Sequence, residues 1–281
     1  MSEILCVRGL TKRYPAFALE EVGFDLRPGA ITGFIGRNGA GKSTTFKSLL
    51  NLVHPDAGEV RFFGLEFAGH EGEIKSRIGY VPGEFVYYPR KRLGAIVDVT
   101  RHFYPNWDEE AYRRCLERFS LEEGKTVSQL SAGMKVKFAL TLALSHRAEL
   151  LLLDEPTSGL DPVSREELLE EFLRLSREEG VTILFSTHIT SDLDRCADEI
   201  LYLRKGRLAE RGSREELVDR YRLMTAKEKP KNSLGACPTA DGWTALYHTG
   251  DAPEGKPASL EDIMVHLEKG GEACEISCGT S

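Results

Sequence analysis

The sequence is organised around Gly36-Arg37-Asn38-Gly39-Ala40-Gly41-Lys42-Ser43-Thr44, which fits the phosphate-loop pattern of Gly, four residues, Gly-Lys and then Ser or Thr. The apolar run 31–35 before it indicates a strand, and residues 46–53 after it have helical spacing. This motif needs a strand, a glycine loop and a helix in that order. The flanking segments therefore favour a phosphate site over the alternative, a chance glycine-rich turn.

The residue types of the loop explain how it would hold phosphate. Gly36, Gly39 and Gly41 have no Cβ, so backbone N–H groups can close around phosphate oxygens. The helix that opens near Lys42 points the positive end of its dipole at the same anions. We expect Lys42 to reach the β- and γ-phosphates and the Ser43 hydroxyl to bind Mg²⁺. The loop alone predicts a bound nucleotide and not its use.

Composition limits the class of protein. A chain of 281 residues with 41% hydrophobic residues predicts one or two domains with a substantial core. The net charge of −7 and the pI near 5.6 argue against nucleic acid as a partner. No apolar run is long enough for a membrane span, and the N-terminus lacks a secretory signal pattern. We therefore expect a cytoplasmic protein without its own membrane helix.

Six cysteines are spread along the chain, and a protein of this size without a signal does not need disulfides. Cys274 and Cys278 lie four residues apart, which leaves a metal or redox pair as an alternative to ordinary thiols. The chain has no second pair with zinc-site spacing, so we favour ordinary thiols in a mobile tail.

The fold class follows from the order of the predicted elements. Residues 150–154 and 181–185 are near-continuous apolar runs, as in parallel strands covered on both faces. Between them we expect a helix that a capping box opens at Ser164 and that Gly180 closes. Two further helices are predicted, one opening at Asn106 and ending at 119, and one over 131–144. This pattern indicates an α/β core with ligand chemistry at the carboxyl ends of its strands.

The composition changes near Tyr221. A polar stretch over 227–233 is typical of a linker, and 243–248 is a candidate strand. A capping box at Ser259 predicts a short helix through Leu267. We therefore divide the chain into 1–222 and a small appendage, 223–281. For the parts outside the helix, a poorly ordered tail is an equal alternative.

Further candidates lie at predicted strand ends and helix starts. Asp154 ends a buried strand and is the expected Mg²⁺ partner, and Glu155 beside it is placed to polarise a water, although an acidic pair can also merely cap a loop. Ser131 precedes a helix, where it can bind an anion or act as a plain N-cap. His188 follows the strand 181–185 and is a candidate phosphate contact, whereas a lone His is more often structural.

Four motifs occur in one order: GRNGAGKST at 36–44, LSAGM at 130–134, LLLLDEPTSGLDP at 150–162 and STH at 186–188. Together they resemble the ATP-binding subunits of ABC transporters over about residues 3–222. The resemblance implies a P-loop NTPase core with a mainly parallel sheet, an N-terminal antiparallel β subdomain and an α-helical subdomain. It also implies that residues 1–222 are an ATPase domain.

The resemblance implies roles for individual residues. The nucleotide contacts would be Tyr14, stacked on adenine, and the Walker A residues Gly36, Asn38, Gly39, Ala40, Gly41, Lys42, Ser43 and Thr44. Ser43 and Asp154 would bind Mg²⁺, Glu155 would be the catalytic glutamate, and His188 would touch the γ-phosphate. Ser131 and Gly133 would reach the ATP held by an opposite subunit, and Asp161 would link the two sites. A packed strand-end tyrosine is the alternative for Tyr14.

Two positions depart from the family pattern. Gly83 stands where the family usually carries Gln, so either Glu84 replaces it or a contact to Mg²⁺ and the membrane partner is lost. Met134 removes a polar contact from the signature segment. An aromatic segment over 85–107 is either the surface that meets the membrane subunit or part of a helical core. The segments FYPNWDEE, LSAGM and SLEDIMVHLEKG resemble exporter subunits found beside antibiotic-response genes of Gram-positive bacteria.

The sequence thus predicts an ATPase subunit that forms a homodimer or heterodimer around two Mg-ATP molecules. It would dock, on the inner face of the membrane, onto separate permease subunits and drive transport, with export favoured over import. One alternative is a soluble ABC ATPase acting on ribosomes or DNA, but the chain has one cassette and no basic patch. The other is a regulatory module that does not hydrolyse ATP.

Overall fold

The computed structural model describes residues 4–83 and 88–270. Glu84, the aromatic residues 85 and 87, and the Cys274–Cys278 pair lie outside the described residues. Within the part of the chain that is described, none of the helices is both long and apolar enough to cross a membrane.

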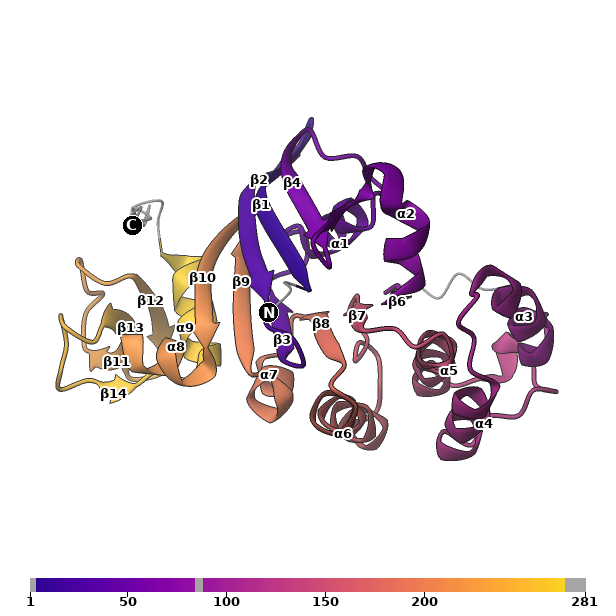
Figure 1. The fold of residues 1–281 in the computed structure, drawn as a ribbon. Helices are drawn as coiled ribbons and strands as arrows, with labels where there is room; N and C mark the ends of the chain where they lie inside the picture. Colours follow the sequence, from indigo (N-terminus) through magenta and orange to yellow (C-terminus); the bar gives the residue numbers. More distant parts are fainter. Residues whose placement is uncertain (1–3, 84–87, 271–281) are drawn as a thin grey trace.

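A six-stranded sheet forms the centre of the molecule (Figure 1). Five strands are parallel, and the edge strand β10 runs antiparallel to β9. The strand order is β10 (Arg207–Ser213), β9 (Glu199–Arg204), β3 (Ile31–Ile35), β8 (Thr182–Thr187), β7 (Leu150–Leu153) and β6 (Ile78–Val81). Alternate side chains of β7 and β8 enter the cores on opposite faces of the sheet, which is why both runs are apolar throughout.

The two faces of this sheet are covered by different layers. Helices α5 (Ala132–Ser145), α6 (Pro162–Glu179) and α7 (Thr190–Cys196) lie on one side, and α1 (Lys42–Leu49) lies on the other. Beyond α1 stands an antiparallel sheet in the order β2 (Phe17–Leu26), β1 (Leu5–Tyr14), β4 (Ala57–Phe62) and β5 (Leu65–Glu66). The mainly parallel core and the antiparallel N-terminal subdomain are therefore confirmed.

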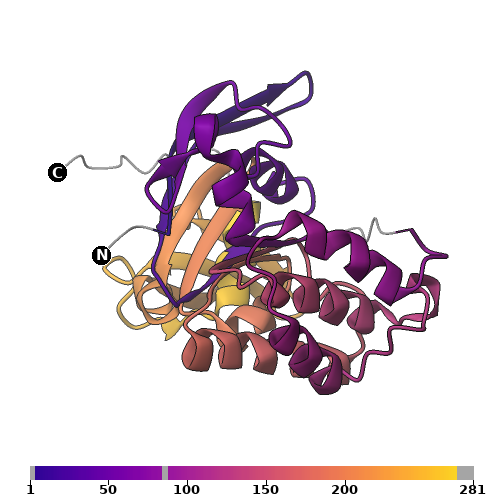
Figure 2. The same cartoon turned by 45° about the vertical axis from the view of Figure 1, so that its right-hand side comes forward.

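Helices project from one end of the central sheet, as Figures 1 and 2 show. This helical subdomain contains α3 (Leu93–Thr100), the 3₁₀ turns η1 (Arg101–Phe103) and η2 (Val127–Gln129), α4 (Glu109–Arg118) and α5. Along the chain it follows α2 (Phe67–Ser76) and the sheet strand β6, and its last helix, α5, leads back into β7. The predicted α-helical subdomain is thus present.

A third sheet lies at the opposite end of the molecule (Figure 1). Its strand order is β12 (Gly235–Thr239), β13 (Gly242–His248), β11 (Tyr221–Ala226) and β14 (Lys256–Pro257), with α8 (Arg214–Arg220) and α9 (Leu260–Lys269) beside it. The polar stretch 227–233 joins β11 to β12, and both strands pair with β13. This stretch is a loop inside one sheet, so its interpretation as a linker was wrong. The division at residue 222 stays a prediction.

Several helix starts differ from the expected ones. Helix α6 begins at Pro162, because the Asp161 carboxylate caps it, and the expected capping box at Ser164 is absent. Asp108 and not Asn106 caps α4, accepting from two backbone N–H groups. Helix α1 starts directly from the glycine loop at Lys42, as expected. The predicted end of α6 at Gly180 and the predicted capping box of α9 at Ser259 are confirmed.

Candidate functional site

A cavity of about 490 Å³ lies where the glycine loop meets the carboxyl ends of β7 and β8. Parallel strands direct these ends to one edge of the sheet, so residues far apart in the sequence share one space. The lining residues are Phe17, Arg37, Asn38, Gly39, Gly41, Lys42, Ser43, Thr44, Glu155, Ser158 and His188. The structure therefore brings most of the predicted Walker A residues together with both predicted catalytic residues.

The glycines of the loop are needed for its path. Gly39 and Gly41 have φ values of 82° and 114°, which favour glycine. A Cβ on Gly36 would lie 2.4 Å from the carbonyl oxygen of Leu203, so only glycine lets the loop lie against β9. Helix α1 then starts with no side-chain cap, which leaves its first-turn N–H groups available to an anion. This cradle fits phosphate.

Lys42 is the cation at the centre of the cavity. Its Nζ donates to the carbonyl oxygen of Gly36 at 2.6 Å and lies 3.0 Å from Oε1 of Glu155. The side chain is only 5% exposed. A buried ammonium needs anionic or carbonyl partners, and phosphate oxygens satisfy the same requirement.

Glu155 connects this cation to His188. Its Oε2 lies 2.7 Å from the Nδ1 atom of His188. Because a carboxylate only accepts, the ring proton lies on Nδ1 and leaves Nε2 as the other polar atom of the ring. The backbone of Glu155 has φ 51°, a left-handed conformation that is uncommon for a residue with a side chain.

Asp154 lies directly before Glu155 and is 4% exposed. Ser186 donates a hydrogen bond of 2.7 Å to its Oδ1 atom. Burial raises the pKa of the nearby Tyr80 phenol to about 12, and the charge of Asp154 adds to this shift. A carboxylate at a strand end and the Ser43 hydroxyl of the loop are the oxygen ligands that Mg²⁺ prefers, so this donor set fits the ion.

The predicted signature residues lie outside this cavity. Ser131 caps α5 and accepts from the backbone N–H of Met134 at 3.2 Å. A Cβ on Gly133 would lie 3.3 Å from the side chain of Ser164 in α6, so the segment packs against the start of that helix. Asp161 caps α6, and hydrogen bonds from Ser164 hold the pKa of its carboxyl below the usual value.

Phe17, and not Tyr14, is the aromatic residue in the cavity lining. The ring of Tyr14 is 43% exposed and has the Lys12 ammonium 5.8 Å from its centre. A Cβ on Gly41 would lie 2.7 Å from the Phe17 ring, which places that ring directly against the glycine loop. Sequence reasoning missed Phe17. The available signal was a second aromatic residue only three positions after Tyr14.

Gly83, at the position where the family usually carries Gln, lies beside the acidic pair. A Cβ at this position would be 3.1 Å from the carbonyl oxygen of Asp154 and 3.7 Å from its Oδ2 atom. Any side chain at position 83 would therefore start close to the candidate metal ligand. Glu84, its expected substitute, is not among the described residues.

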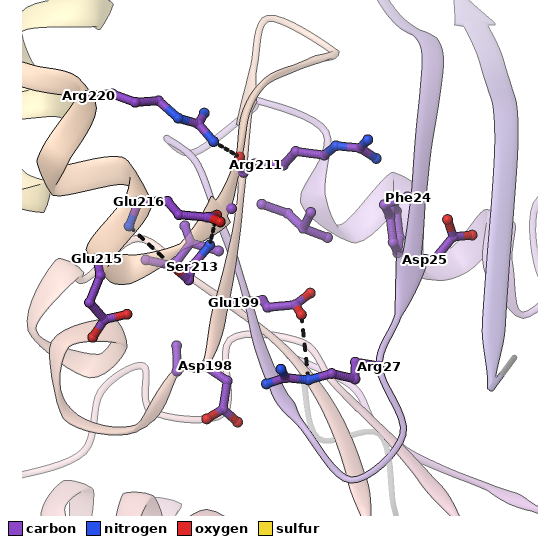
Figure 3. Close-up of a pocket in the computed structure, with 14 residues that line it drawn as sticks. Phe24, Asp25, Arg27, Asp198, Glu199, Arg211, Ser213, Glu215, Glu216 and Arg220 are labelled. Carbon is purple, nitrogen blue, oxygen red and sulfur yellow. Dashed lines mark hydrogen bonds and ion pairs between the residues drawn. The ribbon is translucent and has the colours of Figure 1, made fainter. Parts of the chain in front are cut away.

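A larger cavity of about 660 Å³ lies elsewhere, between β2, the pair β9–β10 and α8 (Figure 3). None of the predicted site residues lines it. Its charged groups are largely paired, for example Arg27 with Glu199 at 3.7 Å and Ser213 with Glu216 in the cap of α8. The smaller cavity is the one lined by the phosphate cradle and by Glu155.

Comparison with known proteins identifies the family of the chain. The family profile described as ABC transporter matches residues 19–158. The chain is 34% identical over 225 residues to the bacitracin transport ATP-binding protein BcrA of Bacillus licheniformis, covering 79% of this chain and 74% of that protein. The chain therefore belongs to the ABC transporter family. Within that family it is an ATP-binding subunit that binds and hydrolyses ATP.

Solved structures show the same fold. A structure described as the ATP-binding subunit of an ABC transporter matches with a TM-score of 0.68 and 30% identity, covering 76% of this chain and 91% of that one. A dimeric ATP-binding cassette, MJ0796 bound to ADP and Pi, matches with a TM-score of 0.66, covering 74% of this chain and 98% of that one. At 22% identity the second likeness shows the fold alone.

Proposed function

We propose that the 490 Å³ cavity is the hydrolytic site of a transport ATPase that acts as a dimer. The observation that carries this proposal is the position of Glu155, which lies between the Lys42 ammonium at 3.0 Å and the His188 ring at 2.7 Å. A base, a cation and a histidine are thus adjacent in the cavity that the phosphate loop lines. Ser43 and Asp154 would hold Mg²⁺.

Each side chain then has a distinct task. Bound Mg-ATP supplies the γ-phosphoryl group that is transferred to water. Lys42 leaves its direct pairing with Glu155 and binds the β- and γ-phosphate oxygens. Glu155, freed from the ammonium, orients a water molecule and accepts its proton. His188 contacts the γ-phosphate through the Nε2 side of its ring.

The signature segment would act on a second nucleotide. Ser131 and Gly133 lie at the start of α5, outside the cavity that contains Lys42. Residues in that place can serve a phosphate only if another chain supplies it. We therefore propose that ATP is enclosed between the glycine loop of one subunit and the signature segment of a second, with Asp161 between the two sites. The partner is a second copy or a related chain.

The helical subdomain offers a surface for a membrane partner. Tyr88, Val99 and Phe103 are 77%, 62% and 76% exposed, respectively. Exposed aromatic and apolar side chains of this size are typical of interaction sites. We propose that this surface docks on separate permease subunits at the inner face of the membrane. The relative BcrA, a bacitracin transport protein, favours export of an antibiotic-like compound.

Substitution of Glu155 tests the hydrolytic role. We expect Glu155→Gln to reduce steady-state ATPase turnover at least 100-fold and to accumulate an ATP-bound dimer, because the amide cannot accept the proton of water. Glu178→Gln is the matched control, since the Glu178 side chain in α6 is 69% exposed and its ion pair with Arg174 is long, at 3.8 Å. Equal turnover in both variants would remove Glu155 from the mechanism.

The membrane partner is tested by purification of the chain from native membranes. Co-purification with a multi-span membrane protein, lost when Tyr88 and Phe103 are replaced by Ser, supports docking through the helical subdomain. Recovery with ribosomes or DNA instead would favour a soluble ABC ATPase.

A further inference from the structure

Ser186 occupies a central place behind the acidic pair. It lies near the end of β8 and is completely buried. Strands β7 and β8 are parallel neighbours, and Leu153 pairs with Phe185. The next residues along each strand, Asp154 and Ser186, therefore meet side by side.

One hydroxyl serves both members of the acidic pair. The backbone N–H of Glu155 donates to Oγ of Ser186 at 2.9 Å, and Ser186 donates to Oδ1 of Asp154 at 2.7 Å. The direction of both bonds is fixed. The N–H group can only donate, so Oγ accepts it, and the single hydroxyl proton is left for the carboxylate.

These two bonds restrain the backbone of Glu155 and the carboxylate of Asp154. The bond from Glu155 holds its left-handed backbone, at φ 51°, and this backbone sets where the carboxylate stands relative to Lys42 and His188. The bond to Asp154 occupies Oδ1 and leaves Oδ2 for a further partner. A hydrogen bond from a neighbouring side chain to a ligating carboxylate orients that carboxylate toward the metal ion.

The hydroxyl of the next residue, Thr187, bonds to a different carboxylate. Thr187 contacts Asp192 at 3.1 Å, because successive strand residues point to opposite faces of the sheet. The Ser186 hydroxyl is thus the one of this pair that reaches the acidic residues.

We infer that Ser186 is a positioning residue that sets the carboxylate of Asp154 for Mg²⁺ and the backbone of Glu155 for water activation. This inference rests on the proposed hydrolytic site. It adds a residue from β8 to a site otherwise assigned to the glycine loop, the acidic pair and His188.

The test compares Ser186→Ala with the natural chain in two measurements. The first is the affinity for ATP, measured with a fluorescent ATP analogue in EDTA and again in Mg²⁺. In EDTA, we expect the affinity of Ser186→Ala for the analogue to stay within about twofold of that of the natural chain. The increase in affinity on adding Mg²⁺ should be about tenfold smaller in the variant. The second is steady-state ATPase turnover, for which we expect kcat to fall about tenfold while the KM for ATP changes less.

Two variants separate positioning from packing. Ser176→Ala removes another buried hydroxyl, which donates to the carbonyl oxygen of Gly29 at 2.6 Å, far from the acidic pair. We expect it to lower thermal stability and to leave the Mg²⁺ gain unchanged. Ser186→Cys keeps a weak donor of similar size and is expected to recover part of the gain, and it also serves as the readout if Ser186→Ala does not fold.

The outcomes are distinguishable. A full Mg²⁺ gain and unchanged kcat in Ser186→Ala, with only a lower melting temperature, would reduce Ser186 to a structural hydroxyl. A natural chain whose ATP affinity does not respond to Mg²⁺ would overturn the proposed metal site and the inference with it.

Discussion

Asp192 offers the sharpest test of how the site is held in place. It lies in α7, is completely buried, and accepts hydrogen bonds from three side chains. These are Thr157 at 2.7 Å, from the loop after the acidic pair, Thr187 at 3.1 Å, from the end of β8, and the guanidinium of Arg165 at 2.5 Å, from α6. One carboxylate therefore joins three elements that meet behind the candidate site.

Replacement of Asp192 by Ala should be severely destabilising. It leaves two buried hydroxyls without their acceptor and leaves Arg165, whose side chain is 25% exposed, without its carboxylate. Breaking a buried ion pair from one side costs about 3–5 kcal/mol. For a chain of 281 residues that corresponds to a fall in Tm of roughly 5–8 °C. Asn at the same position keeps one acceptor and should be intermediate.

Asp194 provides the matched control in the same helix. It pairs with Arg214 at 2.9 Å, but both side chains are 45% exposed, and such surface pairs are worth about 0–1 kcal/mol. Thermal and urea unfolding of Asp192→Ala and Asp194→Ala give the comparison directly. If the two variants unfold at the same temperature, the buried carboxylate does not organise this region and the reasoning fails.

Two other predictions concern pH and the nucleotide. Burial lowers the pKa of His146 to about 4, so between pH 6.5 and 4 the unfolded chain binds a proton that the folded chain does not. Stability should therefore fall on acidification, by about 2 kcal/mol between pH 7.5 and 5 from this group; urea unfolding of His146→Gln should show a smaller loss, and equal losses would exclude the cause. Phe17→Ala should weaken ATP binding about tenfold by equilibrium titration, because its ring lines the cavity, and Tyr14→Ala should weaken it less. The reverse order would support the adenine contact predicted for Tyr14.

The parts of the fold that could be predicted are those encoded locally. The strand before the glycine loop, Ile31–Ile35, has the expected bounds, because a short apolar run ends where the glycines begin. Ser131 is the N-cap of α5, and Ser259 opens α9 with a capping box. Both follow from local sequence, because a serine hydroxyl directly before a helix accepts a hydrogen bond from a backbone N–H of its first turn. The start of α6 was predicted wrongly because the sequence offers two caps three residues apart, Ser164 and Asp161. Asp161, which precedes a proline, is the one that the structure uses.

The residues that sequence reasoning missed act over long distances in the chain. Ser186 contacts Asp154 across 32 positions, and Asp192 contacts Thr157 across 35. No periodicity marks such pairs, because sheet order decides which strand ends are neighbours. A signal was nevertheless present. Two hydroxyl residues, Ser186 and Thr187, stand between the apolar run 183–185 and His188.

Strand β9 supports the glycine loop from the side opposite the acidic pair. The carbonyl oxygen of Leu203 lies 2.4 Å from the position that a Cβ on Gly36 would take. In the turn after β9, the backbone N–H of Gly206 donates to the carbonyl oxygen of Ala40 at 3.0 Å. The phosphate loop is thus supported at Gly36 by β9 and at Ala40 by the turn that follows this strand.

The same strand also contacts helix α9, which lies beside the third sheet. Tyr202 donates to Glu268 of α9 at 2.8 Å, and Arg204 donates to the carbonyl oxygen of Gly270 at 2.7 Å. Glu268 in turn lies 3.9 Å from the guanidinium of Arg37, inside the phosphate-loop motif. The C-terminal region therefore contacts the phosphate loop, more than 200 positions earlier in the chain, directly through Glu268 and Arg37 and indirectly through β9.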